Sequence, residues 1–326
     1  MKRVQRSDAL VKIRKTVVGS FPKLANQIDE ALKKAIDIQL RSGIEIVSDG
    51  EQRADMIEYF EQIPGMARGL GELRIQSKIS PPQTPSEIVK VKDFMLAKDY
   101  VKKLGKGDVA IKTAITGPIT LGVTCAASGL KHYSGLTDMR LYSDLSEALE
   151  PILIELLRLG SFVQLDEPGL SAGYMAPSQA LPIIHNLFDR IAGARTTPGS
   201  ISIHVCGSLK RLPKLFEGLL EFNLDVVSLA FSGRTEHENA DLISEALFES
   251  ARKRLGVGCT PVSALNVEGV ENVEQIYRRI RTIVDKVGER NIAYAHPDDG
   301  FKSTPLEVSE LVLQRFSQAV DRCSLQ

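Results

Sequence analysis

Eight short apolar stretches, each followed by a segment with helical spacing, alternate along the chain. Strands are predicted at 15–22, 44–50, 109–115, 162–168, 201–208, 224–231, 255–259 and 291–295. Apolar residues three and four apart predict helices at 24–42, 86–104, 139–159, 177–193, 209–222, 238–253, 271–287 and 305–323. This alternation is typical of α/β proteins and predicts a single (β/α)8 TIM barrel. No linker or internal repeat divides the sequence, so we expect one domain over residues 1–326.

Polar residues gather where the predicted strands end. In (β/α)8 barrels the carboxyl ends of all strands meet on one face, where active sites lie. We therefore expect the following seven side chains to lie close together despite their separation in sequence: Ser20, Glu51, Thr116, Asp166, His204, Cys206 and Asp299.

Composition and charge narrow the class of protein. The content of 43% hydrophobic and 25% charged residues is that of a soluble globular chain. Lys+Arg and Asp+Glu both number 41, so no net field attracts nucleic acid or an anionic membrane. The four cysteines are widely spaced, and neither an apolar signal segment nor a membrane span is visible. We expect a cytoplasmic protein.

The stretch 201–208, Ile-Ser-Ile-His-Val-Cys-Gly-Ser, carries candidate chemistry. Side chains on a strand alternate between faces, so His204 and Cys206 point the same way. An imidazole and a thiolate side by side form half of a zinc site, although such a pair does not establish one by itself.

Six motifs in chain order strengthen that interpretation. They are residues 18–22 (VGSFP), 49–60 (DGEQRADMIEYF), 116–118 (TGP), 166–168 (DEP), 204–206 (HVC) and 297–300 (PDDG). In this order they resemble the cobalamin-independent methionine synthase family over nearly the whole chain. The chain is similar to the C-terminal catalytic barrel of the long enzymes, and so to the short, single-barrel form.

The resemblance implies a zinc-dependent methyltransferase that makes methionine from homocysteine. A catalytic zinc takes three protein ligands and leaves a fourth position open, here for the substrate sulfur, which becomes a thiolate. Glu51 and Asp166 would face the amino group of homocysteine, Ser20 would contact its amino-acid part, and Thr116 belongs to the same predicted substrate site.

Two ligand positions depart from the family pattern. The family's zinc site has a His, a Cys, a Glu and a second Cys, and the last two positions fall on Ala230 and Asp299 here. Because a carboxylate is an ordinary zinc ligand, His204, Cys206 and Asp299 are the predicted metal-binding and catalytic residues. A role for His296 as a replacement ligand, a different metal and the absence of metal all stay open.

The methyl donor is a separate question. Folate-using members of the family stack the pterin on tryptophan, and this chain contains none. The resemblance therefore implies a methylcorrinoid, or a corrinoid protein, as donor rather than methyltetrahydrofolate. Two other functions remain open: a zinc-dependent alkyltransferase acting on another small thiol, and a metal-free barrel that binds a small molecule.

Overall fold

The protein forms a barrel of eight parallel strands surrounded by helices, as expected from the sequence. A computed structural model describes residues 12–69 and 71–324, so the predicted domain over 1–326 extends at both ends beyond the described residues. The barrel strands are β1 (Arg14–Lys15), β2 (Ile46–Ser48), β5 (Ala110–Thr116), β6 (Phe162–Asp166), β7 (Ile201–Val205), β8 (Val226–Ala230), β9 (Arg254–Gly258) and β10 (Ile292–His296). Each of these strands overlaps a predicted strand, and the barrel prediction is confirmed.

The strands follow one another around the barrel in the order β1-β10-β9-β8-β7-β6-β5-β2. All pairs are parallel, and a single parallel bridge between Thr16 and Ile46 joins the two ends of the sheet. Register pairs Asp166 with His204 and His204 with Ser228 on neighbouring strands. These three residues therefore lie side by side on three neighbouring strands.

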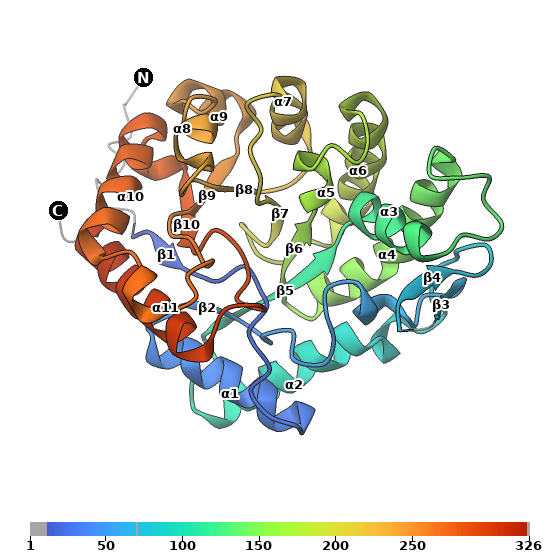
Figure 1. Cartoon of the computed structure of the whole chain (residues 1–326), viewed down its shortest axis with the longest axis horizontal. Helices are drawn as coiled ribbons and strands as arrows, with labels where there is room; N and C mark the ends of the chain where they lie inside the picture. The colour runs from blue at the N-terminus through green and yellow to red at the C-terminus, as the bar shows by residue number, and fades with distance from the viewer. Residues whose placement is uncertain (1–11, 70, 325–326) are drawn as a thin grey trace, which may run out of the picture.

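The helices form an outer ring around the strands (Figure 1). They are α1 (Ile28–Arg41), α2 (Val89–Lys103), α3 (Pro118–Ser128), α4 (Met139–Arg158), α5 (Pro168–Ser171), α6 (Pro177–Ile191), α7 (Pro213–Glu221), α8 (Thr235–Ala240), α9 (Glu245–Ala251), α10 (Val273–Val287) and α11 (Leu306–Cys323). The helix predicted at 238–253 is two helices, because the Ser244 side chain caps the backbone N–H of Leu247 and starts α9 anew.

A small hairpin lies outside the barrel. Strands β3 (Met66–Arg68) and β4 (Leu73–Ile75) pair antiparallel and lie next to α3 (Figure 1). The sequence did not reveal them, because three-residue strands are too short to show a period-two pattern.

The main hydrophobic core lies between the strands and the ring of helices. A separate apolar cluster of Ile46, Val226, Ala293 and Tyr294 packs against the first residues of β5 and β6. Further along the strands many buried positions are polar, and the site described below lies at the strands' carboxyl ends. No helix in the described ranges is long and apolar enough to cross a membrane.

Candidate metal centre and active site

A cavity of about 560 Å³ opens at the carboxyl ends of the strands. Six of the seven predicted site residues line it: Ser20, Glu51, Asp166, His204, Cys206 and Asp299. Met56, Val262 and Leu265 supply apolar wall, and Lys302 lies among the lining residues. The size is ordinary for a small-molecule site.

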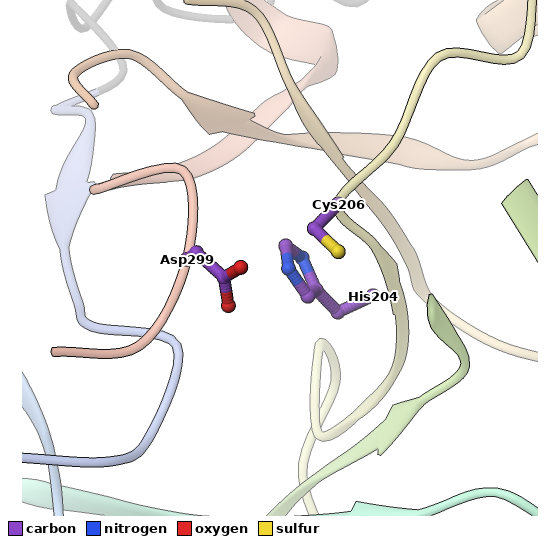
Figure 2. A group of neighbouring side chains, drawn as sticks. All are labelled: His204, Cys206 and Asp299. Carbon is purple, nitrogen blue, oxygen red and sulfur yellow. The ribbon is translucent and has the colours of Figure 1, made fainter. Parts of the chain in front are cut away.

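Three potential metal ligands converge in this cavity. His204 on β7, Cys206 just after β7 and Asp299 after β10 each offer one donor atom, and these atoms lie within 4.8 Å of one another (Figure 2). Ligand atoms around a tetrahedral zinc lie about 3.4–3.6 Å apart, as follows from Zn–S and Zn–N bonds of about 2.3 and 2.0 Å. Small side-chain movements, of about 1 Å, would bring the three donors to that spacing.

The imidazole of His204 has one hydrogen-bonded nitrogen and one nitrogen available to a metal. Its Nδ1 lies 2.9 Å from the hydroxyl of Ser228, while its buried Nε2 has no hydrogen-bond partner among the described residues. Burial, with smaller contributions from His296 and Lys112, lowers the pKa of His204 well below its ordinary value. The ring is therefore neutral, which is the form that binds metal.

Among the described residues, no cation is one of the groups that shift the pKa of the Cys206 thiol. Burial, followed by the nearby carboxylates of Asp299 and Asp166, raises the pKa of Cys206 to about 12. The thiol therefore stays protonated at neutral pH unless a cation enters the site, since a coordinating thiol loses its proton outright. The nitrogen, sulfur and oxygen donors present fit zinc or a similar divalent ion.

Two carboxylates stand beside this cluster, each held by a buried partner. Glu51 accepts a hydrogen bond of 2.5 Å from the ammonium of Lys90, which lies 3.9 Å from the Tyr59 ring centroid. Asp166 accepts a hydrogen bond of 2.8 Å from the side-chain amide of Gln164. The carbonyl oxygen of the same amide accepts a hydrogen bond of 2.6 Å from the ammonium of Lys112. These contacts aim both carboxylates into the cavity.

The backbone of Glu51 is also unusual. Its φ of 49° lies in the left-handed region, which residues other than glycine seldom adopt. An Asx turn, in which the backbone N–H of Glu51 donates to the Asp49 carboxylate at 3.0 Å, holds this conformation. The turn thus places the side chain of Glu51 at the cavity wall.

The pKa values of Asp166 and the neighbouring Lys112 are shifted toward each other. Burial, followed by the charge of Glu51, raises the pKa of Asp166, and burial lowers the pKa of Lys112. Both shifts favour the neutral forms. A cationic ligand beside Asp166 would reverse its shift, because an opposite charge stabilises the carboxylate.

Thr116 does not line the cavity. Its hydroxyl donates 2.6 Å to the backbone carbonyl of Met56 and is buried, so it ties the loop after β2 to the end of β5. Glu167 is likewise turned away from the cavity: it accepts from the backbone N–H groups of Ile119 and Thr120 and caps α3. A Cβ at Gly117 would collide with this carboxylate, which explains the glycine of the TGP motif.

Comparison with known proteins identifies the family. The family model described as the catalytic domain of cobalamin-independent synthase matches residues 3–321. The chain belongs to the cobalamin-independent methionine synthase family. The match confirms the resemblance suggested by the six sequence motifs.

Relatives and solved structures agree with this family. The methionine synthase of Methanothermobacter marburgensis is 30% identical over 324 residues, 93% of this chain and 98% of that protein. A 5-methyltetrahydropteroyltriglutamate–homocysteine methyltransferase of Thermotoga maritima is 24% identical, and the match covers 85% of this chain but 37% of that protein. A B12-independent methionine synthase from Shewanella sp. W3-18-1, in complex with selenomethionine, has the same fold, with a TM-score of 0.75, 19% identity, and 96% and 98% of the two chains covered.

Within this methionine synthase family, the two expected departures have clear structural consequences. Ala230 is buried at the end of β8 and offers only a methyl group, so no ligand comes from that position. Asp299 brings an oxygen to the cluster. His296 does not join the cluster, because its Nε2 is 2.8 Å from the Ser228 hydroxyl and its Nδ1 is 2.7 Å from the Pro297 carbonyl oxygen.

Four residues near the site were not found by the sequence analysis. Lys112, Gln164 and Ser228 occupy strand positions and are almost fully buried, and Lys90 extends from α2 to Glu51. A lysine in the middle of a predicted buried strand is itself a signal, because charged side chains are rarely buried without a partner. By contrast, Cys259 is fully buried outside the cavity and its thiol donates to the His296 carbonyl at 3.5 Å.

Proposed function

We propose that this protein methylates the sulfur of homocysteine, producing methionine, in a single catalytic barrel. The observation that carries the proposal is the convergence of His204, Cys206 and Asp299 with two carboxylates in one cavity of a methionine synthase family member. The short relatives of similar length named methionine synthase support it.

His204 Nε2, Cys206 Sγ and a carboxylate oxygen of Asp299 would hold a zinc ion. Bound there with one position open, the ion would lower the pKa of a substrate thiol and so supply a nucleophile at neutral pH. The unpartnered Nε2 supports this role, since a buried nitrogen without a hydrogen bond lacks any other compensation.

Asp166 and Glu51 would bind the ammonium group of homocysteine. Asp166 has the stronger case, because within the described residues its carboxylate accepts a hydrogen bond from the neutral Gln164 amide and from no cation, whereas Glu51 already accepts from Lys90. An ammonium beside Asp166 favours its ionised form, so binding of the amine would release a proton from the buried site. Ser20 at the cavity wall is suited to the amino-acid part of the substrate.

A methylcorrinoid is the proposed methyl donor. The chain has no tryptophan for stacking a pterin, and the position after the TGP motif where one would be expected falls in a stretch with Leu121, which is buried in α3. In the transfer, a sulfur lone pair forms the new S–C bond and the bond between the methyl carbon and the donor breaks, leaving its electron pair on the donor. The thiol proton passes to solvent.

The decisive experiment combines an activity assay with metal analysis. Purified protein incubated with methylcobalamin and homocysteine should form methionine, and methyltetrahydrofolate should not replace the corrinoid. Cys206→Ala should abolish the reaction and the bound metal, whereas Cys259→Ala, a buried cysteine outside the cavity, should retain both. Equal methionine formation by wild type and Cys206→Ala would refute the proposal.

A second candidate is alkylation of a small thiol without an amino group. The ion pair between Lys90 and Glu51 favours it, because this pair already neutralises one of the two carboxylates. Asp166→Asn discriminates: it should weaken the use of homocysteine but leave an amine-free thiol such as 2-mercaptoethanol unaffected.

A further inference from the structure

Three side chains behind the candidate metal centre form an unbroken hydrogen-bonded chain. His204 Nδ1 is 2.9 Å from Ser228 Oγ, Ser228 Oγ is 2.8 Å from His296 Nε2, and His296 Nδ1 is 2.7 Å from the Pro297 carbonyl oxygen. All three side chains are almost completely buried. Water therefore has little access to these contacts.

The contact between His296 and the Pro297 carbonyl determines which atom donates in each of the other hydrogen bonds. A backbone carbonyl can only accept, so His296 must carry its proton on Nδ1. The ring of His296 is fully buried and its two nitrogens face a hydroxyl and a carbonyl rather than a carboxylate, so the ring is neutral and Nε2 is an acceptor. The Ser228 hydroxyl then donates to His296 and has only lone pairs for His204. His204 must consequently hold its proton on Nδ1, which leaves an unprotonated Nε2.

We propose that Ser228 and His296 are positioning residues that hold His204 in the Nδ1–H tautomer, with the Nε2 lone pair directed at the metal centre. Nε2 is the nitrogen that has no partner within the described part of the chain. The inference rests on the proposed metal site, and it extends that site to two residues that contact neither metal nor substrate. Such outer partners orient a ligand and raise its basicity.

A glycine on the strand between Ser228 and His296 gives room to the side chains beside this contact. β9 lies between β8 and β10, and Gly256 pairs with Ser228 on one side and with Tyr294 on the other. A Cβ at Gly256 would lie 2.5 Å from a ring carbon of Tyr294 and 3.1 Å from the Cβ of Ser228. The glycine therefore leaves room for the Tyr294 ring and for Ser228, whose hydroxyl meets His296 across β9.

The tautomer can be measured directly in metal-free protein. Long-range proton–nitrogen NMR of ¹⁵N-histidine-labelled protein separates protonated from unprotonated ring nitrogens, and the chain has only five histidines to assign. Wild type should show His204 and His296 both protonated on Nδ1. A proton on Nε2 of His204 would overturn the proposal, and this reading needs neither metal nor activity.

Two variants should weaken the affinity for zinc, measured by competition with a chromophoric chelator. Ser228→Ala removes the acceptor and should lower the affinity by about 10–100-fold. His296→Phe leaves the Ser228 hydroxyl with His204 Nδ1 as its acceptor, so the proton should move to Nε2 and the affinity should fall at least as far. Ser228→Thr keeps the hydroxyl and should restore binding. Ser202→Ala, which removes a buried hydroxyl of β7 bonded to the Val163 carbonyl, should bind zinc as wild type does.

The double variant provides the sharpest test. In the His296→Phe background the serine hydroxyl holds the wrong tautomer, so adding Ser228→Ala should improve zinc affinity. A purely structural role predicts the opposite, because two buried substitutions would add their losses. Zinc affinity of Ser228→Ala equal to wild type would refute the proposal. Failure of the proposed function would look different: no zinc binding by wild type, with the His204 tautomer still as described.

Discussion

The buried ion pair between Lys90 and Glu51 makes a quantitative prediction about stability. Lys90 extends from α2 into the barrel mouth, where its ammonium is 2.5 Å from Glu51 and its side chain is 1% exposed. Burial alone would lower the pKa of Lys90, but the carboxylates of Glu51 and Asp49 raise it further than burial lowers it. Lys90→Met keeps the apolar stem and removes only the charge, leaving a buried carboxylate unpaired.

The size of the effect has a ceiling that depends on pH. An unpaired buried carboxylate takes up a proton, and for an ordinary glutamic acid this costs about 3.7 kcal/mol at pH 7 and about 1.6 kcal/mol at pH 5.5. Breaking a buried pair typically destabilises by a similar 3–5 kcal/mol. The unfolding entropy is about 2.1 cal/mol/K per residue, and the chain has 326 residues. The melting temperature of Lys90→Met should therefore fall below that of the wild type by about 5 °C at pH 7 and by about 2 °C at pH 5.5.

Thermal unfolding of ligand-free protein at the two pH values tests this reasoning. Lys92→Met is the matched control: Lys92 lies on the same helix, its pair with Glu87 is exposed, and exposed pairs contribute little. The double variant Lys90→Met with Glu51→Gln should recover part of the loss, because Glu51 is then neutral while the buried carboxylate of Asp49 remains without its cation. Equal losses at both pH values, or no recovery in the double variant, would refute the account.

Three further predictions concern the site and its supporting loops. Because the pKa of Asp166 is raised in the folded state, its ionisation destabilises the fold as pH rises. The melting temperature of Asp166→Asn should therefore exceed that of the wild type at pH 8, with a smaller difference at pH 5. The same variant should use homocysteine less well. Asp299→Cys should tighten zinc binding, increasingly so as pH rises, which chelator competition would measure. Gly117→Ala should destabilise by about 1–3 kcal/mol through collision with Glu167, and Gly107→Ala, with open space around its Cβ, should not.

Much of the barrel could be predicted from local pattern. Each strand is a short apolar run between helical segments, and the eight units recur in order, so strand count, class and topology follow from period and connection rules. The prediction failed where elements were short. The hairpin β3–β4 and the break between α8 and α9 depend on a few residues, and so small a set carries no periodic signal.

The positions of polar residues after the predicted strands indicate which side chains come together at the mouth of the barrel. His204, Cys206 and Asp299 follow the ends of distant strands, and the topology of parallel strands brings those ends to one face. Residue order alone therefore predicted their convergence.

The contacts that each side chain makes there depend on the folded barrel. Thr116 turns to a loop carbonyl, Lys90 reaches Glu51 from a helix, and Ser228 meets His296 across a glycine on the strand between them. A period of two assigns a side chain to one face of a strand, but the partner depends on strand order, register and side-chain length. These quantities are set by packing of the whole barrel rather than by neighbours in sequence.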